Sequence, residues 1–131
     1  PEQQPLMALP PCHVLAQFHV SEGRYLSCSL YQRSGDLGLG VPFNVASYSI
    51  LTHLLAAQCG LEAYELVHHL GHCHVYEDHV APLREQIARF PMTFPTLRIA
   101  AKHERIEDYE EKDFVVSDYR AHPKIEMPLS A

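Results

Sequence analysis

Apolar and polar residues alternate along the first part of the chain and then change to a helical repeat. Residues 13–20 and 24–33 alternate and are separated by residues 21–23, which predicts an antiparallel hairpin. Over residues 42–58 apolar side chains recur at helical spacing, and this predicts a helix that Gly60 ends. Because its apolar stripe is broad, we expect that helix to be mostly buried. One face of the second alternating run carries Leu26, Cys28 and Leu30.

The rest of the chain shows shorter and more interrupted patterns. Residues 65–76 predict another long strand, and Asp78 is placed to cap a short helix that reaches about Phe90. Two short strands are expected around a charged turn, at 97–101 and 114–117 with the turn at 103–113. Strands and helices do not alternate regularly, so the pattern predicts an α+β fold, with a mixed β-sheet and packed helices, rather than a doubly wound parallel sheet.

Composition agrees with one compact domain and argues against several kinds of partner. The chain has 131 residues, 47% of them hydrophobic, which is enough for a core of its own. The chain has ten Lys and Arg residues and sixteen Asp and Glu residues, which give a net charge of −6. No global basic field therefore attracts DNA or a membrane surface. An anionic ligand must be held locally. Without a signal peptide or a bilayer-spanning apolar run, a cytoplasmic or nuclear location is expected.

The cysteines and histidines predict neither disulfides nor a metal site. No paired or metal-finger spacing relates the four cysteines, so we expect reduced thiols. His68, His72 and His74 share one face of a predicted strand, which makes a zinc site conceivable. A long, spaced ligand set is absent, however, so a zinc site is not favoured.

The turn between the second strand and the long helix gathers polar groups. Arg33 offers a planar fork of donors that suits a phosphate. Ser34 and the amides of a glycine-rich turn add neutral donors around the same anion. Asn44 follows in the helix and can both donate and accept. Taken alone, such a loop is more often an ordinary solvated turn.

A second candidate lies upstream, where two prolines come directly before Cys12. The prolines fix the backbone, and a strand follows, so the thiol stands at a rigid entrance. If the next strand brings Arg33 alongside, the guanidinium favours the thiolate that a nucleophile needs. The alternative is a buried and inert cysteine.

Four motifs resemble those of one enzyme family. They are Pro-Pro-Cys-His at 10–13, Tyr-Gln-Arg-Ser-x-Asp-x-Gly-x-Gly-x-Pro-Phe-Asn at 31–44, Leu-Gly-x-x-His-Val-Tyr at 70–76 and His-Pro-x-Ile at 122–125. Together they resemble the C-terminal half of thymidylate synthase. The resemblance implies that residues 1–131 are the C-terminal part of a single catalytic domain of that fold. It also implies an upstream half with further arginines and a glutamate, on which activity depends, and a homodimer.

The resemblance implies reductive methylation of dUMP to dTMP, with 5,10-methylenetetrahydrofolate as cosubstrate and no metal. Cys12 would be the nucleophile that adds to C6 of the uracil. Asp36 and Ser130 would contact the folate. The residues expected to bind the nucleotide are Arg33, Ser34, Gly35, Asp36, Asn44, His74 and Tyr76.

The chain departs from the family pattern at two places. His72 stands where the family has an aspartate, which changes charge and hydrogen-bonding roles. Residues 129–131 replace the usual end of a tail that closes over the folate in relatives. Two other functions stay open. A deoxycytidylate hydroxymethylase would be expected to carry aspartate in place of Asn44, and a degenerate, non-catalytic copy would only bind a partner.

Overall fold

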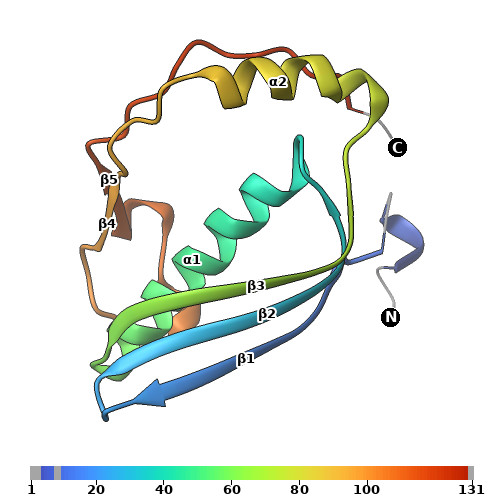
Figure 1. Ribbon diagram of the computed structural model, residues 1–131. Coiled ribbons are helices and arrows are strands. Elements are labelled where there is room, and N and C mark those ends of the chain that lie inside the picture. The colour runs from blue at the N-terminus through green and yellow to red at the C-terminus, as the bar shows by residue number, and fades with distance from the viewer. Residues whose placement is uncertain (1–3, 8–9, 130–131) are drawn as a thin grey trace.

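A three-stranded mixed sheet forms the centre of the protein. The computed structural model describes residues 4–7 and 10–129. The strands are β1 (His13–Ser21), β2 (Tyr25–Asp36) and β3 (Glu62–His74), in the order β1-β2-β3. β1 is antiparallel to β2, whereas β2 is parallel to β3. With α1 packed on this sheet and α2 lying apart from it (Figure 1), the protein has the α+β fold that the sequence predicts.

The hairpin between β1 and β2 is confirmed, with a tight turn. Glu22 and Gly23 have φ of 52° and 64°, and two central residues with positive φ match the right-handed twist of paired strands. The N–H of Arg24 donates to the carbonyl of Ser21 at 3.0 Å. The hairpin fixes which face of β2 is covered. The side chains of that face are Leu26, Cys28, Leu30 and Gln32, all of them buried.

Helix α1 (Gly40–Cys59) connects β2 to β3 and packs on one face of the sheet (Figure 1). Gly60 ends it in the left-handed conformation at φ 70°, as predicted. The expectation of a mostly buried helix is wrong: only Thr52 and Ala56 of α1 are buried, and Phe43 is 73% exposed. The three-stranded sheet covers one side of the helix, and the short strand β4 (Thr96–Ile99) lies against another part of it, but much of its apolar stripe stays exposed.

Strand β3 runs from Glu62 to His74, not from 65 to 76. Its pairing with β2 explains both ends, since the register runs from Tyr25 opposite Glu62 to Asp36 opposite His74. An exposed ion pair marks the start, where Arg24 Nη2 lies 2.6 Å from Glu62 Oε1. The partner strand, rather than local alternation, sets the length of β3.

The helix after β3 does not begin at a cap by Asp78. Helix α2 (Val80–Ala88) follows a 3₁₀ turn, Glu77–His79, that contains Asp78. The residue at the N-cap is His79, and its side chain makes no capping hydrogen bond. That ring is completely buried and turns toward the C-terminal segment instead.

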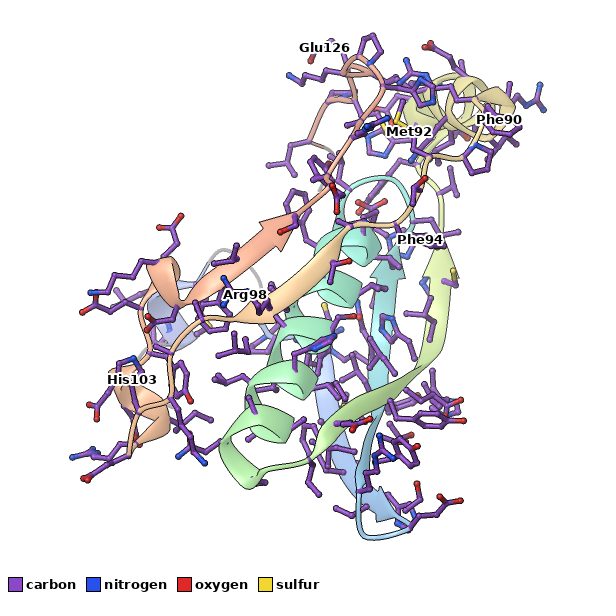
Figure 2. The ribbon with its side chains drawn as sticks, turned by 90° about the vertical axis from the view of Figure 1, so that its left-hand side faces the viewer. Phe90, Met92, Phe94, Arg98, His103 and Glu126 are labelled. Carbon is purple, nitrogen blue, oxygen red and sulfur yellow. The ribbon has the colours of Figure 1, made fainter. Side chains whose placement is uncertain are left out.

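A small sheet of two antiparallel strands, β4 and β5, lies against α1. β4 is shorter than predicted. Figure 2 shows this sheet, with Arg98 on β4 and His103 in the turn beyond it, alongside the helix. The remaining elements are β4 (Thr96–Ile99), β5 (Phe114–Ser117) and the 3₁₀ turns Gln4–Leu6, Ile106–Asp108 and Glu111–Asp113. In the described part of the chain, no helix is long and apolar enough to cross a membrane.

Candidate active site

A cleft of about 640 Å³ opens where β2 leads into α1 and β3 ends. Figure 1 shows that β2 and β3 end on the same side of the sheet. The pairing of β2 with β3 places Asp36 opposite His74, which brings two distant motifs to one edge of the sheet. Six of the predicted site residues line the cleft: Cys12, Ser34, Asp36, Asn44, His74 and Tyr76. Arg33 and Gly35 do not line it, and Ser130 lies outside the described residues.

Cys12 lies at the entrance of β1, and β2 does bring Arg33 alongside it. The N–H of Arg33 donates to the Cys12 carbonyl at 2.9 Å. The guanidinium donates to two other carbonyls, from Nε to Pro11 at 3.3 Å and from Nη2 to Pro10 at 3.2 Å. Arg33 therefore fixes the segment that carries the thiol, and this explains why an arginine and two prolines occur together here.

Gly35 serves the packing beside the cleft. A Cβ at this position would lie 2.9 Å from Leu70 Cδ2 and 3.0 Å from Val41 Cγ2. Contacts this short exclude a larger residue unless both neighbours move. The glycine thus lets β2, β3 and the start of α1 approach closely.

Asp36 organises the turn that begins α1. Its carboxylate accepts N–H bonds from Gly38 at 2.9 Å, Leu39 at 3.1 Å and Gly40 at 3.2 Å. Burial acts to raise the pKa of Asp36, but the three backbone donors and nearby His79 outweigh it, so the pKa is lowered. The carboxylate is therefore ionised at neutral pH. The bonds also explain why α1 begins two residues earlier than its apolar pattern indicates.

Gln32 is a site residue that the sequence analysis missed. Its side chain is buried, and its Nε2 donates to the Ser34 carbonyl at 2.7 Å and to Asn44 Oδ1 at 2.9 Å. Its Oε1 accepts a hydrogen bond from His68 Nε2 at 2.9 Å. A polar residue on the otherwise apolar face of β2 was the available signal. Because Asn44 Oδ1 faces Gln32, the orientation of the Asn44 amide is fixed.

His68 completes this network as a neutral ring. Burial, with smaller contributions from His13 and His69, lowers the pKa of His68. A carbonyl oxygen can only accept, so the proton that the ring retains lies on Nε2, toward Gln32. In this series of hydrogen bonds, His68 donates to Gln32 and Gln32 donates to Asn44.

A row of rings forms the side of the cleft at the end of β3. The rings of His72 and His74 are stacked at 5.1 Å, and Tyr76 meets His74 edge-on at 5.2 Å. His74 Nδ1 is buried without a hydrogen-bond partner in the described structure, which leaves it available to a ligand. His72, the departure from the family pattern, contacts the row but does not line the cleft.

All four cysteines are free thiols, and only Cys12 lines the cleft. Among residues 4–7 and 10–129, no group of three or more His, Cys, Asp or Glu side chains is arranged to hold a metal ion. The chemistry that the cleft offers is therefore that of a thiol beside amide, carboxylate and imidazole groups.

A family model described as thymidylate synthase matches residues 1–131. The chain belongs to the thymidylate synthase family. A human relative named thymidylate synthase is 51% identical over 130 residues, which are 99% of this chain and 41% of the human protein. The chain thus spans about two-fifths of the length of that curated relative. The match covers β1 to β5 and every described residue of the cleft.

Proposed function

We propose that the cleft takes part in the methylation of deoxyuridine monophosphate to thymidine monophosphate. The observation that carries the proposal is the convergence of five predicted residues, from the end of β2, from α1 and from the end of β3, on one cleft beside Cys12. Membership of the family supports the same reaction.

Cys12 acts as the nucleophile in this proposal. Its thiolate forms a bond to C6 of the uracil, and the electron pair of the C5–C6 double bond moves toward C5 and O4. C5 then forms a bond to the methylene carbon of 5,10-methylenetetrahydrofolate, C5 gives up its proton, and the bond from that carbon to the folate nitrogen breaks. The folate returns a hydride to the transferred carbon, which becomes the methyl group, and leaves as dihydrofolate. Covalent addition makes an otherwise unreactive ring nucleophilic. Elimination of the Cys12 thiolate finally releases the methylated nucleotide.

The neighbouring groups bind and orient the nucleotide. Asn44 reads the uracil edge, with its NH2 toward O4 and its Oδ1 accepting from N3–H. Gln32 favours this orientation because it already holds Oδ1. His74 and Tyr76 bind the sugar, Ser34 binds the phosphate and Asp36 contacts the folate. Arg33 supports them by holding the segment that carries Cys12.

In this proposal the activity requires protein beyond this chain, which spans 41% of its human relative. The large exposed surface of α1, with Phe43 at the cleft, is consistent with cover by further protein. In this proposal an upstream half supplies more arginines and a glutamate, and two copies form a homodimer.

The test is covalent trapping in the intact protein with 5-fluorodeoxyuridylate and the folate, followed by peptide mapping. We expect the adduct on Cys12. Cys12→Ser should abolish turnover while nucleotide binding persists, because a hydroxyl is a far weaker nucleophile and the other contacts remain. Cys59→Ser, at an exposed thiol outside the cleft, is the matched control. An adduct on another cysteine, or turnover by Cys12→Ser, would contradict the proposal.

A further inference from the structure

His79 is a buried polar side chain that the proposed chemistry does not use. Its ring is completely buried, although it lies between the 3₁₀ turn and α2. Nε2 lies 2.7 Å from the Pro128 carbonyl, 49 positions along the chain. Because a carbonyl only accepts, the ring donates Nε2–H. The ring thus ties the beginning of α2 to the C-terminal segment.

The opposite edge of the same ring touches the turn that begins α1. His79 Nδ1 lies 3.9 Å from Asp36 Oδ1, and a Cβ on Gly38 would lie only 2.5 Å from Nδ1. The glycine therefore leaves the space that the ring occupies. Packing on this side holds the ring in place, so that its Nε2–H is directed at the Pro128 carbonyl.

The C-terminal segment returns along α2 (Figure 1), and within the described residues its other hydrogen bonds to side chains lie farther from the cleft. Arg89 donates to the Pro123 carbonyl and His122 Nε2 to that of Phe90 at 2.8 Å, both well before the cleft. After its contact with His79 at Pro128, the segment continues to Leu129. Leu129 lines the cleft although it is 89% exposed. Ile125 and Met127 of this segment are half-buried, but Leu129 itself has little packing, and the hydrogen bond from His79 to Pro128 is the side-chain bond next to it.

We propose that His79 is a positioning residue, which holds the C-terminal tail at the cleft through the Pro128 carbonyl. The tail in turn places Leu129 on the apolar side of the cleft, with Leu39 and Phe43. An apolar wall suits the flat ring system of the second substrate rather than the phosphate and sugar of the nucleotide. His79 therefore controls affinity for the folate. This inference rests on the proposed function.

The first measurement is amide hydrogen exchange on the intact protein. His79→Leu removes the donor at similar volume, and we expect faster exchange in the tail, residues 125–129. His79→Gln keeps a donor and should retain most of the protection. His122→Leu, which removes a different tail contact away from the cleft, is the control and should leave residues 125–129 unchanged. Unchanged exchange there in His79→Leu would overturn the inference.

The second measurement is steady-state kinetics. His79→Leu should raise KM for methylenetetrahydrofolate by about tenfold, the effect of about one hydrogen bond and its stranded carbonyl, with the Kd of the nucleotide unchanged. His79→Gln should restore most of the affinity. A chain ending at Met127 should show the same rise, and His79→Leu should add nothing to it. Equal weakening of nucleotide and folate, or additive effects, would overturn the inference.

The two measurements separate the inference from the proposed function. If the unaltered protein neither forms the Cys12 adduct nor methylates the nucleotide, the proposed function fails, while hydrogen exchange still decides whether His79 holds the tail. If His79→Leu does not fold, the chain ending at Met127 tests the tail without altering the buried ring, and an unchanged KM for the folate would then refute the inference.

Discussion

Gln32→Glu changes one atom of the buried network and should reverse the reading of the pyrimidine. The glutamate keeps an acceptor for His68 but presents an oxygen where Nε2 donated to the Ser34 carbonyl and to Asn44 Oδ1. Three acceptors then face one another. Rotation of the Asn44 amide by half a turn removes part of this repulsion, because the Asn44 NH2 then donates to residue 32. The same rotation exchanges the positions of the amide donor and acceptor that Asn44 presents to the cleft.

The size of the effect follows from the bonds that change. Rotation of Asn44 recovers one of the two lost bonds and leaves the Ser34 carbonyl unpaired, a cost of about 1–3 kcal/mol in the free energy of unfolding. Toward uracil, the rotated amide opposes donor to donor and acceptor to acceptor. At about 1–3 kcal/mol for a stranded group, the affinity for deoxyuridylate should fall about 10- to 100-fold. Cytosine matches the rotated amide.

The assay is the Kd of deoxyuridylate and of deoxycytidylate, measured by calorimetry on the intact protein at about pH 8, well above the ordinary glutamate pKa of about 4.3. We expect the preference for deoxyuridylate to fall by at least about tenfold. Gln86→Glu makes the same charge change at an exposed position and should leave the preference unaltered. If Gln32→Glu lowers stability but keeps the ratio of the two Kd values, Gln32 does not orient Asn44.

Two further predictions concern stability. The Glu110 backbone N–H and His103 lower the pKa of Asp113, so its contribution is present above the ordinary aspartate pKa of about 3.9 and disappears as pH falls through the lower folded value. Asp113→Asn should therefore lower Tm at neutral pH, with the difference vanishing in acid; a constant difference across the pH range would refute this. A Cβ on Gly71 would lie 2.9 Å from the Arg33 carbonyl oxygen. Gly71→Ala should therefore lower the free energy of unfolding in urea by about 1–3 kcal/mol. The control is Cys73→Ala, on the same strand and exposed, which should lower it by less than about 0.5 kcal/mol.

Strand and helix positions could be predicted because each depends on local side-chain order. Alternation in β2 places Leu26, Cys28 and Leu30 on the covered face. This alternation can be recognised in the sequence without knowing which element covers that face. Gly60 ends α1 for an equally local reason, its freedom at positive φ. The limits of β3 were predicted two or three residues too late, because its pairing with β2 sets them.

Site residues divide in the same way. The sequence by itself predicted which residues would form the site, Cys12 and Asn44 among them, because their motifs are contiguous, and the structure places both in one cleft. Only the tertiary structure decided how those residues are held. Gln32 meets His68 across 36 positions, and His79 meets Pro128 across 49. Strand register and the return of the C-terminal segment bring these groups within hydrogen-bonding distance. No local sequence pattern relates the two partners of such a pair. A buried polar group nevertheless needs a hydrogen-bond partner, however distant that partner is in the sequence.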